Sequence, residues 1–233
     1  MDHMVTSYGS DDDVTKMIDA YDWYFVPVMN PDGYVYSWET NRNWRKSRNI
    51  NEGSTCMGTD LNRNYDVNWG LVGISTNPCS DTYLGSAPAS EPETEIIQGE
   101  IDRLADDLDS FVTFHTAATM WLIPWGHSID GVCVRADDHE EMMEILNPTV
   151  DAIQDTHGDL SWARGNSCET IYATSGTTAD YAKKMAPGLP MSATPELRGS
   201  FVMPPESITP SFEENWNGIK TMVDVILERR NAK

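Results

Sequence analysis

The chain has 233 residues and is strongly acidic, with 37 Asp and Glu against 16 Lys and Arg and a formal net charge of −21 at pH 7. This charge disfavours nucleic acids and anionic membranes as partners, because both would repel most of the surface. The length and the hydrophobic content of 39% fit one soluble globular domain over residues 1–233, which we expect to be a monomer. No apolar run approaches the ~20 residues of a membrane-spanning helix. The first residues show no signal peptide.

The N-terminal third combines a few ordered segments with a long irregular stretch. The acidic run 11–13 predicts either a helix N-terminus or a solvated turn. Residues 22–29 form an apolar run that predicts a buried strand, and residues 30–33 (Asn-Pro-Asp-Gly) predict a turn after it. Residues 34–84 are rich in Asn, Gly, Ser, Thr and Asp and show little periodicity. So long an irregular stretch in a compact domain is usually functional or cross-linked.

The rest of the chain alternates predicted strands and helices. Residues 90–93 have the spacing of a capping box and predict a helix start. Strands are predicted at 111–116, 120–124 and 191–197. A helix is predicted at 138–157, with a kink or break at Pro148. Thr209 and Pro210 predict the start of a last helix. Its expected inner face carries Phe212, Trp216, Ile219, Val223, Ile226 and Leu227. This alternation predicts an α/β fold with a mixed, mainly parallel twisted sheet and helices on both faces.

Four cysteines are present, at positions 56, 79, 133 and 168, and none is part of a Cys-x-x-Cys motif. This spacing disfavours a redox motif or a zinc ribbon. An even count allows two disulfides in three possible pairings, and four buried thiols are the alternative. Disulfides would indicate a protein from outside the cytoplasm.

A short basic stretch stands out in this acidic chain. Its cations are Arg42, Arg45, Lys46, Arg48 and Arg63. Only two acids, Glu52 and Asp60, lie within it. Because a guanidinium can bind a carboxylate through two parallel hydrogen bonds, the stretch predicts an anion site. The alternative is a solvated basic loop, and the interleaved Trp44, Asn62 and Asn64 favour the more structured site.

Three further residues are candidates for chemistry. His115 lies in an otherwise apolar strand and is either a metal ligand or a satisfied core histidine. Glu196 lies near a strand end, where it is either a general base or the ion-pair partner of Arg198. Tyr172 precedes a flexible-looking stretch at 173–178 and is either a mobile phenol or a half-buried aromatic side chain.

Taken in order, these motifs resemble the zinc carboxypeptidases of the pancreatic A and B type. The matching segments are 27–34 (PVMNPDGY), 41–46 (NRNWRK), 58–64 (GTDLNRN), His115, 170–172 (TIY) and 196–198 (ELR). The resemblance runs from about residue 15 to the C-terminus. It implies the carboxypeptidase fold without its first strands, one zinc ion as cofactor, and the C-termini of peptides or proteins as substrates.

The resemblance also implies roles for the matched residues. His115 would be a zinc ligand, and Arg45 would polarise the scissile carbonyl and hold the developing oxyanion. Glu196 would be the general base that takes a proton from the zinc-bound water. The residues that would bind the terminal carboxylate or line the approach to the site are Asn62, Arg63, Tyr172 and Arg42.

The same resemblance places Ala179 at the base of the pocket for the C-terminal side chain. Because Ala179 is small and uncharged, we expect a preference for large apolar or aromatic residues. The other expected wall positions are Thr113, Leu122, Ile171, Thr174 and Thr194. The resemblance further implies disulfides Cys56–Cys79 and Cys133–Cys168, and with them a secreted, extracellular protein.

One part of the family pattern is missing. The two other zinc ligands of the family come from a His-x-x-Glu motif, and none of the five histidines here has Glu three residues later. One ligand cannot hold a catalytic zinc. We therefore expect the chain to be a C-terminal portion of a longer carboxypeptidase. The alternative is a catalytically inactive module that binds peptide C-termini. A calcium-binding acidic domain is a weaker possibility, because no EF-hand-like loop is present.

Overall fold

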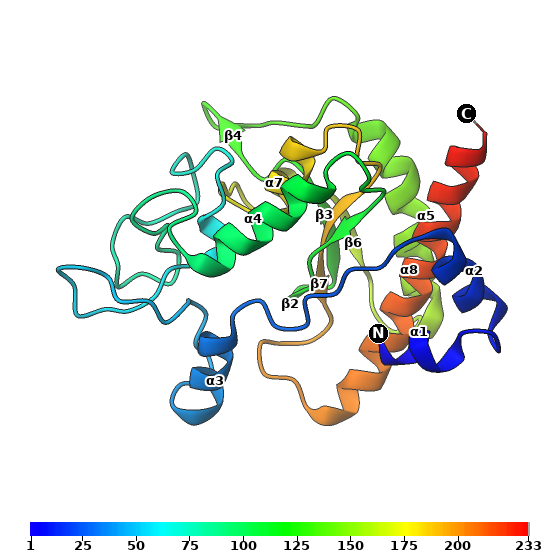
Figure 1. Ribbon diagram of the computed structural model, residues 1–233, viewed down its shortest axis with the longest axis horizontal. Helices are drawn as coiled ribbons and strands as arrows, with labels where there is room; N and C mark the ends of the chain where they lie inside the picture. Colours follow the sequence, from blue (N-terminus) through cyan, green and yellow to red (C-terminus); the bar gives the residue numbers. More distant parts are fainter. Residues whose placement is uncertain (233) are drawn as a thin grey trace.

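A five-stranded sheet forms the centre of the molecule (Figure 1), and the computed structural model describes residues 1–232. Its strands are β1 (Phe111–Val112), β2 (His115–Thr116), β3 (Met120–Ile123), β6 (Ala163–Asn166) and β7 (Ser192–Leu197). The order is β1-β7-β3-β6, and β2 pairs with β7 after β1 ends. β1 and β2 run parallel to β7 and β3 runs parallel to β6, whereas β3 and β7 are antiparallel. The predicted mixed, mainly parallel sheet is confirmed.

Helices pack on both faces of the sheet. The four largest contributors are α4 (Pro92–Leu104), α5 (His139–His157), α7 (Thr178–Met185) and α8 (Ile208–Asn231). α5 and α8 lie side by side and enclose one apolar cluster with Trp121 of β3 (Figure 1). α4 and α7 enclose a second cluster around Tyr65. Phe111 packs against the second cluster and Val112 against the first, because neighbouring strand residues point to opposite faces.

The N-terminal helices are α1 (Asp2–Ser7), α2 (Asp12–Ala20) and α3 (Pro31–Glu39). The side chain of Asp11 accepts a hydrogen bond from the Val14 N–H at 3.0 Å, so the acidic run does begin a helix. α2 packs on α8 through Met17. α3 begins at Pro31, and the Asn30 side chain caps it by accepting from the Gly33 N–H. The turn predicted at 30–33 is therefore wrong, because Asn followed by Pro is also a strong helix start.

The strand predicted at 22–29 is also wrong. The segment is extended but unpaired, and four of its apolar side chains are exposed: Tyr24, Phe25, Val26 and Val28. None of its backbone groups bonds to another backbone group within residues 1–232. Periodicity detects an apolar extended segment, but a strand also needs a neighbour to complete its hydrogen bonds.

The three helices predicted to start at 90–93, at 138 and at Thr209 are confirmed, but one detail of each differs. α4 starts at Pro92 with Glu91 before it, and Ser90 bonds to the Glu91 carboxylate instead of capping the helix. α5 continues through Pro148 without a break, because its apolar side holds it against the first cluster. α8 starts at Ile208, and Phe212 is exposed, in contrast to the buried Val223, Ile226 and Leu227.

Short elements and two disulfides fix the connecting segments. The short elements are η1 (Leu61–Arg63), β4 (Ser128–Ile129), β5 (Val132–Cys133), α6 (Ser167–Thr170) and η2 (Pro205–Ser207). Cys56 is bonded to Cys79, and Cys133 is bonded to Cys168, which joins β5 to α6. Both pairings expected from the resemblance are confirmed.

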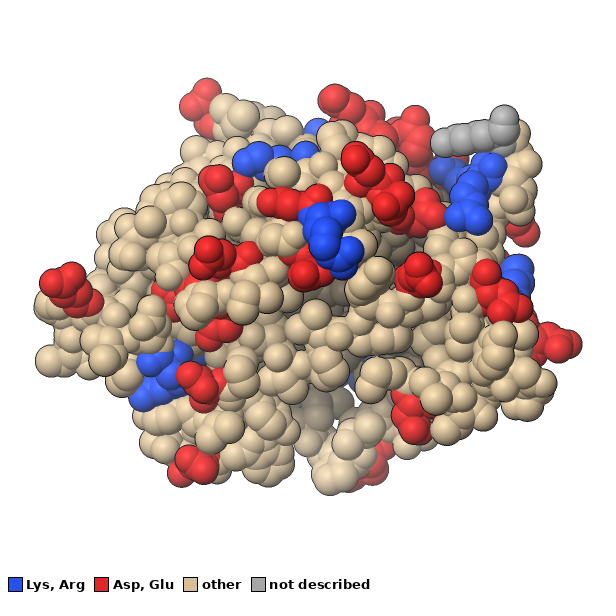
Figure 2. Space-filling model, viewed as in Figure 1, with Lys and Arg blue, Asp and Glu red and all other residues tan. Residues whose placement is uncertain are grey.

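The surface follows the composition. Figure 2 shows Asp and Glu side chains spread over one face, with few Lys and Arg among them. Within residues 1–232, no helix has both the length and the apolar character needed to cross a bilayer.

Candidate functional site

A cavity of about 230 Å³ lies beside β2 and β7. Eleven of the thirteen residues predicted for the site line it, and the two that do not are Arg42 and Thr113. The lining residues come from three sources: the strand ends, the turn around η1, and the segment that leads into α7. Residues far apart in the chain therefore meet at one place.

His115 and Glu196 face each other across two parallel strands. They are direct partners in the register of β2 and β7. The distance from His115 Nδ1 to Glu196 Oε1 is 3.7 Å, which is too long for a hydrogen bond. Burial and the nearby Arg45 and Arg63 lower the pKa of His115 to about 4, so the imidazole is neutral at pH 7. Burial raises the pKa of Glu196, and Arg45 opposes this effect.

Asp60 positions the basic side of the cavity. Its Oδ2 accepts a hydrogen bond from Arg45 Nε at 2.9 Å and lies 2.9 Å from Arg45 Nη2 in an ion pair. Its Oδ1 accepts from the Asn62 N–H at 3.1 Å and caps η1. Asp60 is 2% exposed, so this carboxylate is fully committed to the two contacts. Sequence reasoning assigned it no role, although Asp60 is one of only two acids within the basic stretch.

Arg63 is held from two sides. Its Nε donates to Gly73 O at 2.9 Å, and its Nη1 donates to Asn62 O at 2.7 Å. Gly176 packs against the Arg63 backbone, where a Cβ would lie 2.4 Å from Arg63 O, and its φ of +71° also favours glycine. The Asn62 Oδ1 accepts from the Thr178 N–H at 3.0 Å, which leaves the Nδ2 amide as the free donor.

The other cations of the basic stretch do not enter the cavity. Arg42 lies over the ring of Trp38, with its Cζ 5.1 Å from the ring centroid. Arg48 lies over the ring of Tyr36, with its Cζ 3.6 Å from the ring centroid. Lys46 Nζ donates to the backbone carbonyl of Pro78. Two arginines of the basic stretch, Arg45 and Arg63, therefore line the cavity. The remaining cations instead stack on or bond to nearby groups.

Tyr172 and the pocket wall complete the cavity. Tyr172 is 54% exposed and lies at the cavity. Ala179 and Thr194 line the pocket as predicted, together with Leu122, Ile171 and Thr174. Thr113 instead bonds through its backbone N–H to Ala193 O, in the gap between β1 and β2.

The alternative in which Glu196 pairs with Arg198 is wrong. Arg198 donates from Nε to the buried Glu214 at 2.8 Å and from its Nη atoms to Asp159 at 3.0 Å. Because another acid neutralises Arg198, Glu196 remains available to the cavity.

Asp180 makes stability depend on pH. It is 2% exposed, and burial raises its pKa to about 7 even though the Gly126 N–H donates to the carboxylate. Between about pH 4 and pH 7 the folded chain keeps a proton on Asp180 that the unfolded chain has lost. The free energy of unfolding therefore falls as the pH rises through this range. Asp180→Asn keeps an acceptor for Gly126 but cannot ionise. We therefore expect the free energy of unfolding of this variant, relative to that of the unmodified chain, to rise by about 2 to 3 kcal/mol from about pH 5 to about pH 8. Urea unfolding at both pH values measures this gain, and an equal difference at both would contradict it.

The described residues do not by themselves fit a catalytic zinc. Such a site needs about three protein ligands and an open position. His115 is the one imidazole that lines the cavity in the described part of the chain. Nowhere in residues 1–232 do three His, Cys, Asp or Glu side chains gather as metal ligands would.

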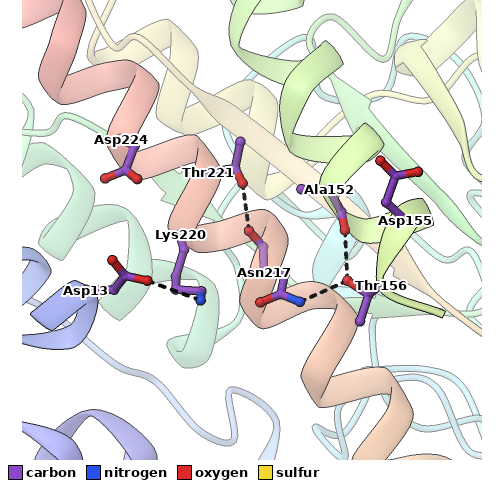
Figure 3. Close-up of a pocket in the computed structure, with 8 residues that line it drawn as sticks. All are labelled: Asp13, Ala152, Asp155, Thr156, Asn217, Lys220, Thr221 and Asp224. Carbon is purple, nitrogen blue, oxygen red and sulfur yellow. Dashed lines mark hydrogen bonds and ion pairs between the residues drawn. The ribbon is translucent and has the colours of Figure 1, made fainter. Parts of the chain in front are cut away.

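A second hollow lies between α2, α5 and α8 and contains none of the predicted residues. Figure 3 shows that its polar groups mostly bind one another. Asn217 Nδ2 donates to Thr156 Oγ1 at 3.0 Å, and Lys220 lies 3.4 Å from Asp13. This hollow is a solvated groove between helices, and the cavity beside β2 and β7 remains the candidate site.

Comparison with known proteins agrees with this geometry. The model of the zinc carboxypeptidase family matches residues 1–218. Carboxypeptidase O of Bos taurus is 34% identical over 230 residues, which cover 97% of this chain and 60% of that protein. Carboxypeptidase A2 of Rattus norvegicus is 37% identical over 225 residues, which cover 95% of this chain and 52% of that protein.

Solved structures show the same fold. The crystal structure of thrombin activatable fibrinolysis inhibitor matches with a TM-score of 0.90 and 29% identity, over 97% of this chain and 56% of that one. The chain thus spans about half to three fifths of the length of these relatives. It belongs to the zinc carboxypeptidase family.

Proposed function

We propose that the cavity binds the free C-terminus of a peptide, and that residues 1–233 form the substrate-binding part of a zinc carboxypeptidase catalytic domain. The observation that carries this proposal is the meeting of Arg45 and Arg63 with His115 and Glu196 in one cavity. An enzyme that cuts only at a chain end must recognise a carboxylate. The Arg63 guanidinium, the Asn62 amide and the Tyr172 phenol supply donors for it.

The proposed chemistry is hydrolysis of the last peptide bond, with Glu196 as general base. Its raised pKa makes this carboxylate a stronger proton acceptor than an exposed glutamate. Arg45, fixed by Asp60, is placed to polarise the scissile carbonyl. The family's zinc would activate the attacking water. His115 would be one ligand, and the others would come from outside the described residues.

The proposed substrates end in large apolar or aromatic residues. Leu122, Ile171 and the small Ala179 give the pocket apolar walls. The proposed location is extracellular, because two disulfides persist where the environment is oxidising.

A second candidate function is binding without catalysis. The observation that favours it is the lack of a metal-ligand group in the part of the chain that the structure describes. Under this proposal the chain captures peptide C-termini and does not cut them.

Titration calorimetry on the full chain tests the proposal. A peptide that ends in Phe should bind as the free acid and lose at least tenfold in affinity as the C-terminal amide, because the carboxylate contacts disappear. Equal affinity for acid and amide would overturn the proposal. Zinc content and turnover of the same peptide then separate the two functions. Stoichiometric zinc with turnover supports the enzyme, and binding without either supports the capture module.

A further inference from the structure

Two oxygen atoms converge at one end of the cavity, next to Gly126. The point that a Cβ on Gly126 would occupy is 2.8 Å from Thr174 Oγ1 and 3.3 Å from Asp180 Oδ2. Thr174 and Asp180 both line the cavity. The Thr174 hydroxyl and the Asp180 carboxylate therefore lie close together against Gly126, where any side chain would clash with the hydroxyl.

Neither oxygen is fully satisfied by the protein. The Thr174 backbone N–H donates to Gly126 O at 2.7 Å, but its hydroxyl has no partner among residues 1–232. The Asp180 carboxylate accepts from Gly126 N at 3.1 and 3.0 Å and has the Thr177 hydroxyl as a second partner, and no Lys, Arg or His nitrogen of the described chain lies within 4.0 Å of it. Carboxylate and hydroxyl oxygens have room for more than one donor. The pair is therefore an acceptor site that the fold leaves open.

Part of the wall of the same cavity is apolar. Leu122, Ile123, Ile171 and Ala179 line the same cavity. The matching side chain is an apolar body that carries one hydrogen-bond donor at its tip. A tyrosine has this form, whereas phenylalanine lacks the donor.

A cationic tip fits less well than a phenol. Removing an ammonium or guanidinium group from water costs more than removing a hydroxyl group. Burial also raises the pKa of Asp180 to about 7, so near neutral pH this carboxyl group carries only part of the charge that a cation would need. A phenol can donate to either oxygen whatever the protonation state of Asp180.

We propose that Thr174 and Asp180 make the cavity selective for a C-terminal tyrosine over phenylalanine. This inference rests on the proposed function, because it assumes that the last side chain of a bound peptide enters this pocket. It narrows the substrate class from large apolar or aromatic residues to phenolic ones.

The test compares peptides that differ only in their last residue. Calorimetry at about pH 6 uses the full chain and peptides ending in Tyr, Phe, O-methyltyrosine and Lys, with the Tyr amide as control. One added hydrogen bond in a buried site predicts about tenfold tighter binding of the Tyr peptide than of the Phe peptide. The O-methyltyrosine peptide, which has no donor, should bind no better than the Phe peptide.

Two substitutions at one position assign the effect to Thr174. Thr174→Val keeps the shape and removes the hydroxyl. We expect it to reduce the ratio of Tyr affinity to Phe affinity to about twofold. Thr174→Ser keeps the hydroxyl and should retain the preference, which serves as the matched control.

Different failures have different meanings. Equal affinity for Tyr and Phe, or tightest binding of the Lys peptide, overturns the selectivity while the proposed function stands. An undiminished Tyr preference in Thr174→Val removes Thr174 from the recognition. If the Tyr acid and its amide bind equally, the proposed function and this inference fall together.

Discussion

Arg63→Ala is expected to abolish the recognition of peptide C-termini. We expect roughly a 100-fold loss of affinity for a free-acid peptide, or about 3 kcal/mol, because truncating one partner of a buried, hydrogen-bonded charge pair costs 2–5 kcal/mol. The amide of the same peptide should bind the variant and the unmodified chain equally. Calorimetry with both ligands measures the difference, and it isolates the contact with the carboxylate.

The controls for Arg63 separate charge, geometry and folding. Arg63→Lys keeps the charge but loses the planar fork, so an intermediate loss of about tenfold is expected. Arg103→Ala removes an exposed arginine that pairs with Glu100 on α4 and should have no effect on binding. Because Arg63 also bonds to Gly73 O, thermal melts should accompany each titration. A folded Arg63→Ala protein that still prefers acid over amide would remove Arg63 from the proposed clamp.

Loss of the disulfides is expected to have the largest effect on stability. The Cys56–Cys79 bond closes 23 residues and the Cys133–Cys168 bond closes 35. Loop-closure entropy assigns about 3 to 4 kcal/mol to each bond, so together they account for much of the roughly 5–15 kcal/mol that stabilises an ordinary domain. The double variants Cys56→Ser/Cys79→Ser and Cys133→Ser/Cys168→Ser should each melt roughly 10 °C lower.

The two double variants also differ in what they release. The loop closed by Cys56 and Cys79 contains both Arg63 and its partner Gly73, so its variant should lose peptide affinity as well as stability. Calorimetry and melting curves on both variants check these expectations. Unchanged melting temperatures would show that the bonds do not constrain the unfolded chain.

The sequence was most informative about the site residues that belong to short motifs. Asn62 next to Arg63, the strand histidine His115 and Glu196 were all assigned to one site, and the structure brings them to one cavity. This assignment came from the resemblance of several ordered motifs, because composition and periodicity left His115 and Glu196 with structural alternatives of equal or greater weight.

The sequence failed where a residue's role depends on how side chains or backbone pack in three dimensions. The segment 22–29 has the apolar pattern of a strand, but no described backbone pairs with it. Arg42 and Arg48 belong to the basic stretch, yet aromatic rings at Trp38 and Tyr36 take them out of the site. No pattern in one sequence reveals such pairings, because they depend on packing that brings distant or differently oriented side chains together.

Asp60 has a consequence for how this site can change. One carboxylate orients the Arg45 guanidinium and caps the turn that presents Asn62 and Arg63. A substitution of Asp60 would therefore disturb Arg45 and the turn with Asn62 and Arg63 at the same time. Any evolutionary change at this one position must be tolerated by both.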